Sequence, residues 1–130
     1  MVGLLIVSHS GKIAEGIKEL ADQVTQQQVP VAAAGGTSDG RLGTSVDLIR
    51  SAAERLIAGG SDSVFVLIDL GSAVISAEMA LEDFTHPYRL SDAPLVEGAI
   101  MAAVEASVGA ALERIAEVAE QTKDLRKVHR

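Results

Sequence analysis

Three short apolar runs, bounded by polar, proline or glycine residues, predict the main strands of this chain. Residues 4–7, 31–34 and 64–68 are almost entirely apolar, which is typical of strands buried on both faces of a parallel sheet. Residues 86–90 predict a shorter fourth strand. Because segments with helical periodicity separate these runs, we expect repeated strand-helix-strand units and hence a single α/β domain.

Apolar residues recur at three- and four-residue spacing between the strands and again after the last strand. This spacing predicts helices over residues 11–27, from Thr44 or Ser45 to Gly59, over 74–83, and from Pro94 to Thr122. The last pattern is rich in alanine and includes Gly109, where we expect a kink or a break. Its apolar surplus is explained equally well by packing within one domain and by packing against a second subunit.

Composition and charge argue against several classes of binding partner. The 130 residues are 48% hydrophobic but only 2% aromatic, and they carry a net charge of −7. These values favour neither base stacking nor attraction to a phosphate backbone, so we expect no nucleic acid partner. The sequence has no cysteine, no basic leader and no apolar run long enough to span a membrane. We therefore expect a cytoplasmic protein that binds no membrane.

Two ionisable residues stand directly after apolar runs. His9 follows the first run, lies between two serines and precedes Gly11, while Asp69 follows the third run. Because the carboxyl ends of parallel strands share one edge of a sheet, adjacent strands would bring this carboxylate to the histidine ring and orient it. The simpler alternatives are that His9 only forms a local hydrogen bond and that Asp69 only caps the next helix.

Residues 35–43 form a glycine-rich loop at the same edge. Its glycines either cradle an anion through backbone N–H groups or only allow a wide turn. Two further histidines, His86 at the opposite end of its strand and His129 in a basic tail, have no predicted partner. Because metal-ligand spacing, a dinucleotide-binding motif and a nucleophile elbow are all absent from the sequence, we expect no metal and no cofactor. A histidine with a carboxylate partner, hydroxyls and glycines suits a phosphoryl group carried on the ring.

Five short motifs carry a resemblance to a known family. They are Val7-Ser8-His9-Ser10, Gly35-Gly36-Thr37, Gly43-Thr44-Ser45, Asp69-Leu70-Gly71-Ser72-Ala73 and Ala93-Pro94-Leu95-Val96-Glu97-Gly98-Ala99. Over residues 2–122 the chain resembles the mannose-type enzyme IIA family and, within it, the phosphotransferase subunits of bacterial phosphoenolpyruvate-dependent dihydroxyacetone kinases. The resemblance implies a three-layer α/β/α domain over residues 1–122, with a mainly parallel sheet of about four strands in the order 2-1-3-4. The basic C-terminal tail, residues 123–130, lies outside it.

The chemistry of that family implies roles for particular residues of this chain. In the family, the histidine at the position of His9 accepts a phosphoryl group from the phosphocarrier protein HPr and passes it to ADP on the nucleotide-binding subunit of the kinase. Asp69 would orient the ring so that Nε2 is the nucleophile. Their place on the same rim makes the hydroxyls of Thr37, Thr44 and Ser72, with the backbones of Gly36 and Gly71, the candidate donors to the phosphoryl oxygens. The family also implies a homodimer, and we expect apolar contacts around Leu42 and Leu70 to dock the kinase subunit.

Two other functions remain open on the sequence. A mannose-type IIA component of a sugar transporter uses the same histidine, but it typically has Thr-His-Gly where this chain has Ser8-His9-Ser10. A signalling receiver domain is phosphorylated on an aspartate at the end of strand three, where Asp69 stands, but receivers have an acidic pair after strand one. Many family members continue into HPr-like and enzyme-I-like domains; because this sequence does not, we expect it to use a separate phosphocarrier.

Overall fold

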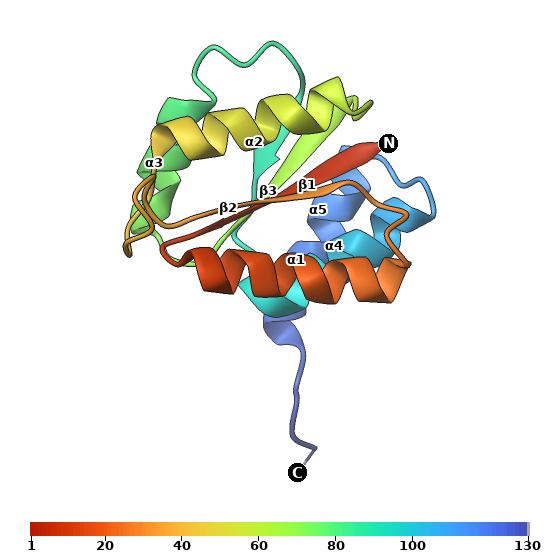
Figure 1. Cartoon of the computed structure of the whole chain (residues 1–130). Coiled ribbons are helices and arrows are strands. Elements are labelled where there is room, and N and C mark those ends of the chain that lie inside the picture. Colours follow the sequence, from red (N-terminus) through yellow and green to blue (C-terminus); the bar gives the residue numbers. More distant parts are fainter. Residues whose placement is uncertain (130) are drawn as a thin grey trace.

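The computed structural model describes residues 1–129 as one sheet of four parallel strands between two layers of helices (Figure 1). The strands are β1 (Val2–Ser8), β2 (Val31–Gly35), β3 (Ser63–Ile68) and β4 (Tyr88–Leu90). Their order across the sheet is β2-β1-β3-β4, and each neighbouring pair is parallel. The predicted three-layer α/β/α fold and the strand order 2-1-3-4 are therefore confirmed.

Five α-helices and one 3₁₀ helix connect and follow these strands within the described residues. They are α1 (Gly11–Thr25), α2 (Val46–Ala58), α3 (Ser72–Ala80), α4 (Leu95–Ser107), α5 (Leu112–Gln121) and η1 (Thr122–Asp124). The helices α2 and α3 cover one face of the sheet, and α1, α4 and α5 cover the other (Figure 1). Within residues 1–129, no helix combines the length and the apolar character needed to cross a membrane.

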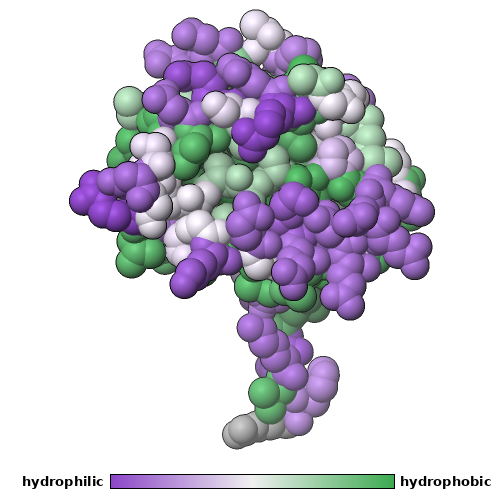
Figure 2. All heavy atoms as spheres, in the orientation of Figure 1, coloured by the Kyte–Doolittle hydropathy of each residue, from purple (hydrophilic) through white to green (hydrophobic). Residues whose placement is uncertain are grey.

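The chain leaves the body of the domain after η1. Residues 125–129 have no regular secondary structure and project from the body (Figure 1), and most of this projection is hydrophilic (Figure 2). Lys127 is nevertheless tied back to α4, because its ammonium lies 2.7 Å from a carboxylate oxygen of Glu97. The projecting segment therefore keeps an ionic contact to the helical layer.

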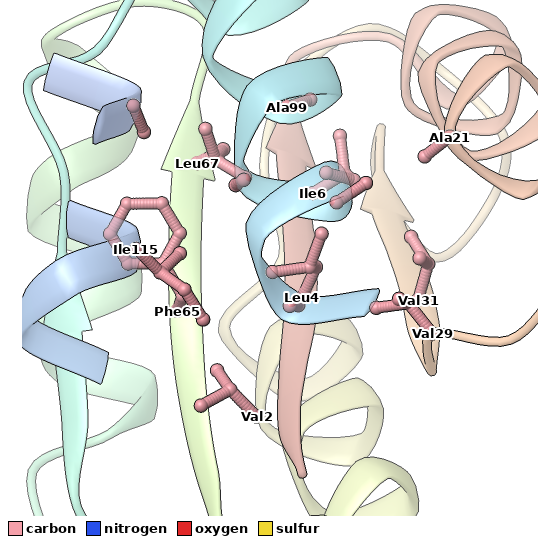
Figure 3. Close-up of a cluster of buried hydrophobic side chains, with 14 of the residues drawn as sticks. Val2, Leu4, Ile6, Ala21, Val29, Val31, Phe65, Leu67, Ala99 and Ile115 are labelled. Atoms are coloured by element: carbon pink, nitrogen blue, oxygen red, sulfur yellow. The ribbon is translucent and has the colours of Figure 1, made fainter. Parts of the chain in front are cut away.

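Side chains on the two faces of β1 form two separate cores. Leu4 and Ile6 pack with Phe65 of β3 beneath α1, α4 and α5 (Figure 3). Leu5 and Val7 point to the opposite face and pack beneath α2 and α3. All five side chains are completely buried, which explains why the run has no polar alternation. This double burial holds the carboxyl end of β1 in place.

The alanines of the last predicted helix belong to the core of this domain. The buried residues of α4 are Gly98, Ala99, Ala102, Ala103 and Ala106. A Cβ atom on Gly98 would lie 2.6 Å from the Cβ of Ala93 and 3.2 Å from Leu67, so a larger residue would collide with the segment before α4 and crowd β3. Packing within one domain, rather than against a second subunit, therefore accounts for the buried alanines of α4.

The first helix is shorter than predicted. It ends at Thr25 rather than at residue 27, because Gln26 and Gln27 adopt left-handed backbone conformations with φ of 54° and 61°. The N–H group of Gln27 then donates to the carbonyl of Asp22 over 2.8 Å and closes the helix end. The sequence does not indicate this stop, since glutamine is a good helix former.

The later elements also differ from their predicted bounds. The helix predicted over residues 74–83 is α3, Ser72–Ala80, and the fourth strand keeps only three residues, Tyr88–Leu90. The long helix predicted from Pro94 is broken, as expected, and Gly109 with φ of 80° separates α4 from α5. Pro94 is the N-cap of α4 rather than its first helical residue.

Candidate active site

The carboxyl edge of the sheet brings His9 and Asp69 together. The strands β1 and β3 are adjacent, and their register pairs Val7 with Ile68, so the residues that follow each strand are neighbours. Nδ1 of the His9 ring lies 3.0 Å from Oδ1 of Asp69. The backbone N–H group of His9 also donates to Oδ2 of Asp69 over 2.9 Å. The carboxylate thus holds both the ring and the backbone of the histidine.

Both oxygens of Asp69 accept further hydrogen bonds. The Ser8 hydroxyl donates to Oδ2 over 2.8 Å, and the N–H group of Leu70 donates to Oδ1 over 2.7 Å. Partial burial by itself would raise the pKa of Asp69, but hydrogen bonds from the His9 backbone, the Ser8 hydroxyl and the His9 ring outweigh it and hold that pKa below its ordinary value. The carboxylate is therefore ionised at neutral pH.

The ionised carboxylate decides which nitrogen of the neutral His9 ring carries the proton. A carboxylate without a proton can only accept hydrogen bonds, so the network assigns the proton to Nδ1 and leaves a lone pair on Nε2. The Ser72 hydroxyl lies 2.8 Å from Nε2 and donates to it. The His9 side chain is 28% exposed, and Nε2 is the ring nitrogen that Asp69 does not contact.

Ser8 is a part of this site that the sequence reasoning did not single out. Its side chain is completely buried, donates to Asp69, and accepts a hydrogen bond of 3.0 Å from the N–H group of Ser10. It therefore links the carboxylate to the first turn of α1, whose N-cap is Ser10. A hydroxyl at the end of an otherwise apolar, buried strand was the available signal, because a buried polar group needs a partner.

Glycines allow the loop after β2 to lie close to the histidine. A Cβ atom on Gly35 would collide with the carbonyl oxygen of Ser10 and would lie 2.8 Å from the Cβ of Ala14. At the far end of the loop, the N–H group of Gly43 donates to the carbonyl of His9 over 2.8 Å. The glycines therefore serve the close approach of backbones around the histidine.

Three of the predicted phosphoryl-binding residues are engaged in other contacts. The N–H group of Gly36 donates back to β1 over 3.1 Å, and the Thr37 hydroxyl donates to the carboxylate of Asp39 within the loop. The Thr44 hydroxyl lies 2.7 Å from the hydroxyl of Ser76 on α3. In this structure the N–H group of Gly36 and the hydroxyls of Thr37 and Thr44 therefore have partners within the protein. The N-cap of α2 is Ser45, the second of the two predicted alternatives.

Gly71 and Ser72 lie at the start of α3, beside the ring. Their backbone N–H groups donate to no protein acceptor within residues 1–129. Unpaired N–H groups at a helix start are suited to an anion. The N-cap of α3 is Gly71, which makes no side-chain capping bond, so neither Asp69 nor Ser72 caps this helix. The alternative in which Asp69 serves only as a cap is therefore wrong.

The remaining candidate residues are exposed at different places. Leu42 is 80% exposed and precedes Gly43, whose N–H group donates to the carbonyl of His9. Leu70 is 61% exposed, and its own N–H group donates to Asp69. His86 precedes β4, at the amino ends of the strands, with its ring 5.7 Å from that of Phe84, and His129 is exposed in the basic tail. In the part of the chain that the structure describes, no three acidic or histidine side chains are grouped so as to hold a metal ion.

Relatives of known family match nearly the whole chain. The family model EIIA-man, described as PTS system fructose IIA component, matches residues 3–116. The phosphoryl donor subunit DhaM of PEP-dependent dihydroxyacetone kinase 2 from Listeria innocua is 40% identical and covers 88% of this chain and 94% of its own length. The phosphoryl donor subunit DhaM from Escherichia coli is 39% identical over 88% of this chain, but this chain spans only 25% of that longer protein.

Solved structures agree with the fold. A crystal structure of a protein described as having unknown function has a TM-score of 0.80 at 36% identity, and the match covers 92% of this chain and 93% of that one. A sigma-54 interaction domain protein from Enterococcus faecalis, with a TM-score of 0.73 at 18% identity, shares the fold alone; the match covers 95% of this chain and 90% of that one.

Fold and site together define an α/β domain that presents an aspartate-oriented histidine at the carboxyl edge of a parallel sheet. The chain belongs to the EIIA-man family of phosphotransferase-system IIA components. Within that family, the resemblance of its motifs to the phosphotransferase subunits of dihydroxyacetone kinases is confirmed by the identity to their phosphoryl donor subunits.

Proposed function

We propose that this protein carries a phosphoryl group on Nε2 of His9, which it accepts from the phosphocarrier HPr and passes to ADP on the nucleotide-binding subunit of a dihydroxyacetone kinase. The observation that carries this proposal is the pair of contacts on the ring, with Asp69 at Nδ1 and Ser72 at Nε2. The names of the relatives support the choice of partners. The exchange requires no cofactor on this chain and is proposed to take place in the cytoplasm.

Phosphorylation begins when the Nε2 lone pair attacks the phosphorus of an incoming phosphohistidine in line with the bond that breaks. The new Nε2–P bond forms while the nitrogen of the donor recovers its electron pair. Because Nδ1 keeps its proton, the phosphorylated ring of His9 carries a positive charge next to the ionised Asp69, 3.0 Å away. Asp69 therefore stabilises the phosphorylated state and keeps the ring in position.

The start of α3 supplies the donors that hold the phosphoryl oxygens. The Ser72 hydroxyl is displaced from Nε2 by the phosphorus, and rotation of its side chain lets it donate to a phosphoryl oxygen. The unpaired N–H groups of Gly71 and Ser72 donate to the same group, and the positive end of the helix dipole favours its charge. Transfer is then mainly a matter of positioning.

In the second half-reaction, an oxygen of the β-phosphate of ADP attacks the same phosphorus. The O–P bond forms, the Nε2–P bond breaks, and its electron pair returns to the ring. Donor and acceptor both approach Nε2, the ring nitrogen of His9 that Asp69 does not contact, so they occupy the rim in turn. We propose that the exposed side chains of Leu42 and Leu70 pack against the partner and exclude water during transfer.

The acceptor distinguishes this function from sugar transport. We expect the phosphorylated protein to convert ADP on the cognate kinase subunit to ATP, with free ADP as a poor acceptor. Leu70→Asp is expected to slow this transfer by about 10-fold or more, because it places a charge in an apolar contact. The rate of transfer of a radioactive phosphoryl label in a single turnover checks both expectations.

Val108→Asp is the matched control for that experiment. Val108 is 77% exposed and is the C-cap of α4. The next residue, Gly109, lies beside the amino ends of β1 and β3, far from His9, so substitution of Val108 should leave transfer unchanged. Efficient transfer to the histidine of a mannose-type IIB protein, with none to kinase-bound ADP, would assign the protein to sugar transport instead.

We also propose a homodimer that forms through the outer faces of α1 and α4. These helices pack against each other on one face of the sheet, and they expose Leu20, Val24, Val96 and Val104. Exposed apolar side chains on two adjacent helices support an interface between copies. Sedimentation at micromolar concentration is expected to give a dimer mass, and Leu20→Glu combined with Val104→Glu a monomer mass. A monomer in the unsubstituted protein would contradict this proposal.

A further inference from the structure

Basic side chains are concentrated after α5. Four of the 11 lysine and arginine residues, but only one of the 18 acidic residues, lie within residues 123–130. The body of the domain therefore carries the whole acidic excess. The side chains of Lys123, Arg126 and Lys127 are exposed. The protein is thus an acidic domain with a cationic arm, defined here as residues 123–129.

The fold places the start of this arm on the rim of the active site. Lys123 lines a hollow of about 300 Å³ together with Asp69, Leu70 and Gly71, which belong to the loop that carries the partner of the histidine. Residues 91–95, which precede α4, form the other wall of the hollow. From there the chain runs past the first turn of α4 and projects from the body (Figure 1). Sequence separation alone gives no hint that residue 123 adjoins residue 69.

The second half-reaction brings an anion to this rim. ADP must place its diphosphate against the phosphoryl group on His9, and the acidic body of the domain repels that charge. Other basic side chains at this edge are Lys12, in the first turn of α1, and Arg41, whose guanidinium lies 2.9 Å from the carboxylate of Asp39. The arm contributes three further basic side chains, of which Lys123 lines the rim itself, while Arg126 and Lys127 follow it along the projecting segment.

We propose that residues 123–129 form a docking arm for the acceptor protein and that its cations attract the diphosphate of the ADP which that protein carries. This inference rests on the proposed function, because it names how the acceptor of that function is bound. Without an acceptor, Lys127 is paired with Glu97 in the first turn of α4, and the two side chains are 2.7 Å apart. When the acceptor docks, the diphosphate replaces this single carboxylate as the partner of the arm.

The test compares two variants after both have been fully phosphorylated. One variant, K123Q/R126Q/K127Q, removes the three charges; the other, K123R/K127R, preserves them. At low ionic strength, the charge-free variant is expected to transfer its phosphoryl group to ADP on the kinase subunit about 10-fold more slowly than the unsubstituted protein. The two rates should converge as ionic strength rises from about 0.02 to 0.5 M, and the charge-preserving variant should match the unsubstituted protein throughout.

A binding measurement separates the nucleotide from the protein that carries it. The unphosphorylated proteins are titrated into the kinase subunit with and without bound ADP. The loss of affinity caused by the three glutamines is expected only with ADP present; an equal loss in both forms would overturn the diphosphate contact. Equal transfer rates for both variants at every ionic strength would also overturn the inference while leaving the proposed function intact. Failure of the unsubstituted protein to phosphorylate kinase-bound ADP would reject the proposed function itself.

Discussion

Replacing His9 with glutamine is expected to abolish labelling of the protein by phosphoenolpyruvate, enzyme I and HPr. The amide of glutamine has no lone pair on nitrogen that is free to attack phosphorus, although its size allows it to remain beside Asp69. His86→Gln and His129→Gln are the matched controls, because both histidines are exposed away from the Asp69 carboxylate and should leave labelling unchanged. Incorporation of radioactive phosphate measures all three variants.

The chemical stability of the label gives an independent readout. Phosphohistidine survives base and is lost in acid, whereas an acyl phosphate on Asp69 is lost in base. We therefore expect a base-stable, acid-labile label in the unsubstituted protein. A base-labile label, or labelling that persists in the glutamine variant, would remove His9 from its role and favour the receiver-like alternative.

Replacing Asp69 with asparagine is expected to slow phosphoryl transfer by about 10² to 10⁴-fold, the range for a positioned acid or base partner. The substitution keeps the shape of the side chain but removes the negative charge that faces the phosphorylated ring and fixes the proton on Nδ1. Single-turnover transfer from phosphorylated HPr measures the effect. Asp92→Asn is the control, because Asp92 is exposed and lines the same hollow without contacting the ring. Normal transfer combined with a loss of helix content would show that Asp69 has a structural role only.

The pH dependence of stability tests the hydrogen bonds on Asp69 separately from catalysis. Its pKa lies below the ordinary value of 3.8 in the folded protein, so ionised Asp69 stabilises the fold fully above that value and loses this contribution as the pH falls through the lowered pKa. The difference in the free energy of unfolding between the unsubstituted protein and Asp69→Asn is therefore expected to be largest above about pH 5 and to shrink below pH 3.8. Urea unfolding at a series of pH values measures it, and a difference that does not change with pH would contradict the assignment.

Much of the fold was predictable because each strand is marked by local composition. The runs that became β1 and β3 are buried on both faces, so they contain no polar alternation and cannot be mistaken for surface strands. The break before α5 was also predictable, because Gly109 supplies a positive φ that other residues avoid. The end of α1 was not, since Gln26 and Gln27 take left-handed conformations that glutamine does not favour.

By itself, the sequence determined that strands alternate with helices and that His9 and Asp69 each follow a buried strand. Those facts are local, because apolar periodicity reports burial residue by residue. Only the tertiary structure decided that Ser8 joins the carboxylate network, that Gly36, Thr37 and Thr44 are engaged elsewhere, and that Lys123 reaches the rim. These contacts join groups whose positions follow from strand register and helix packing, and side-chain hydroxyls have several partners within reach until the backbone is placed. His9 and Asp69 are 60 residues apart in the sequence, and they are in contact because β1 and β3 are adjacent in the packed sheet.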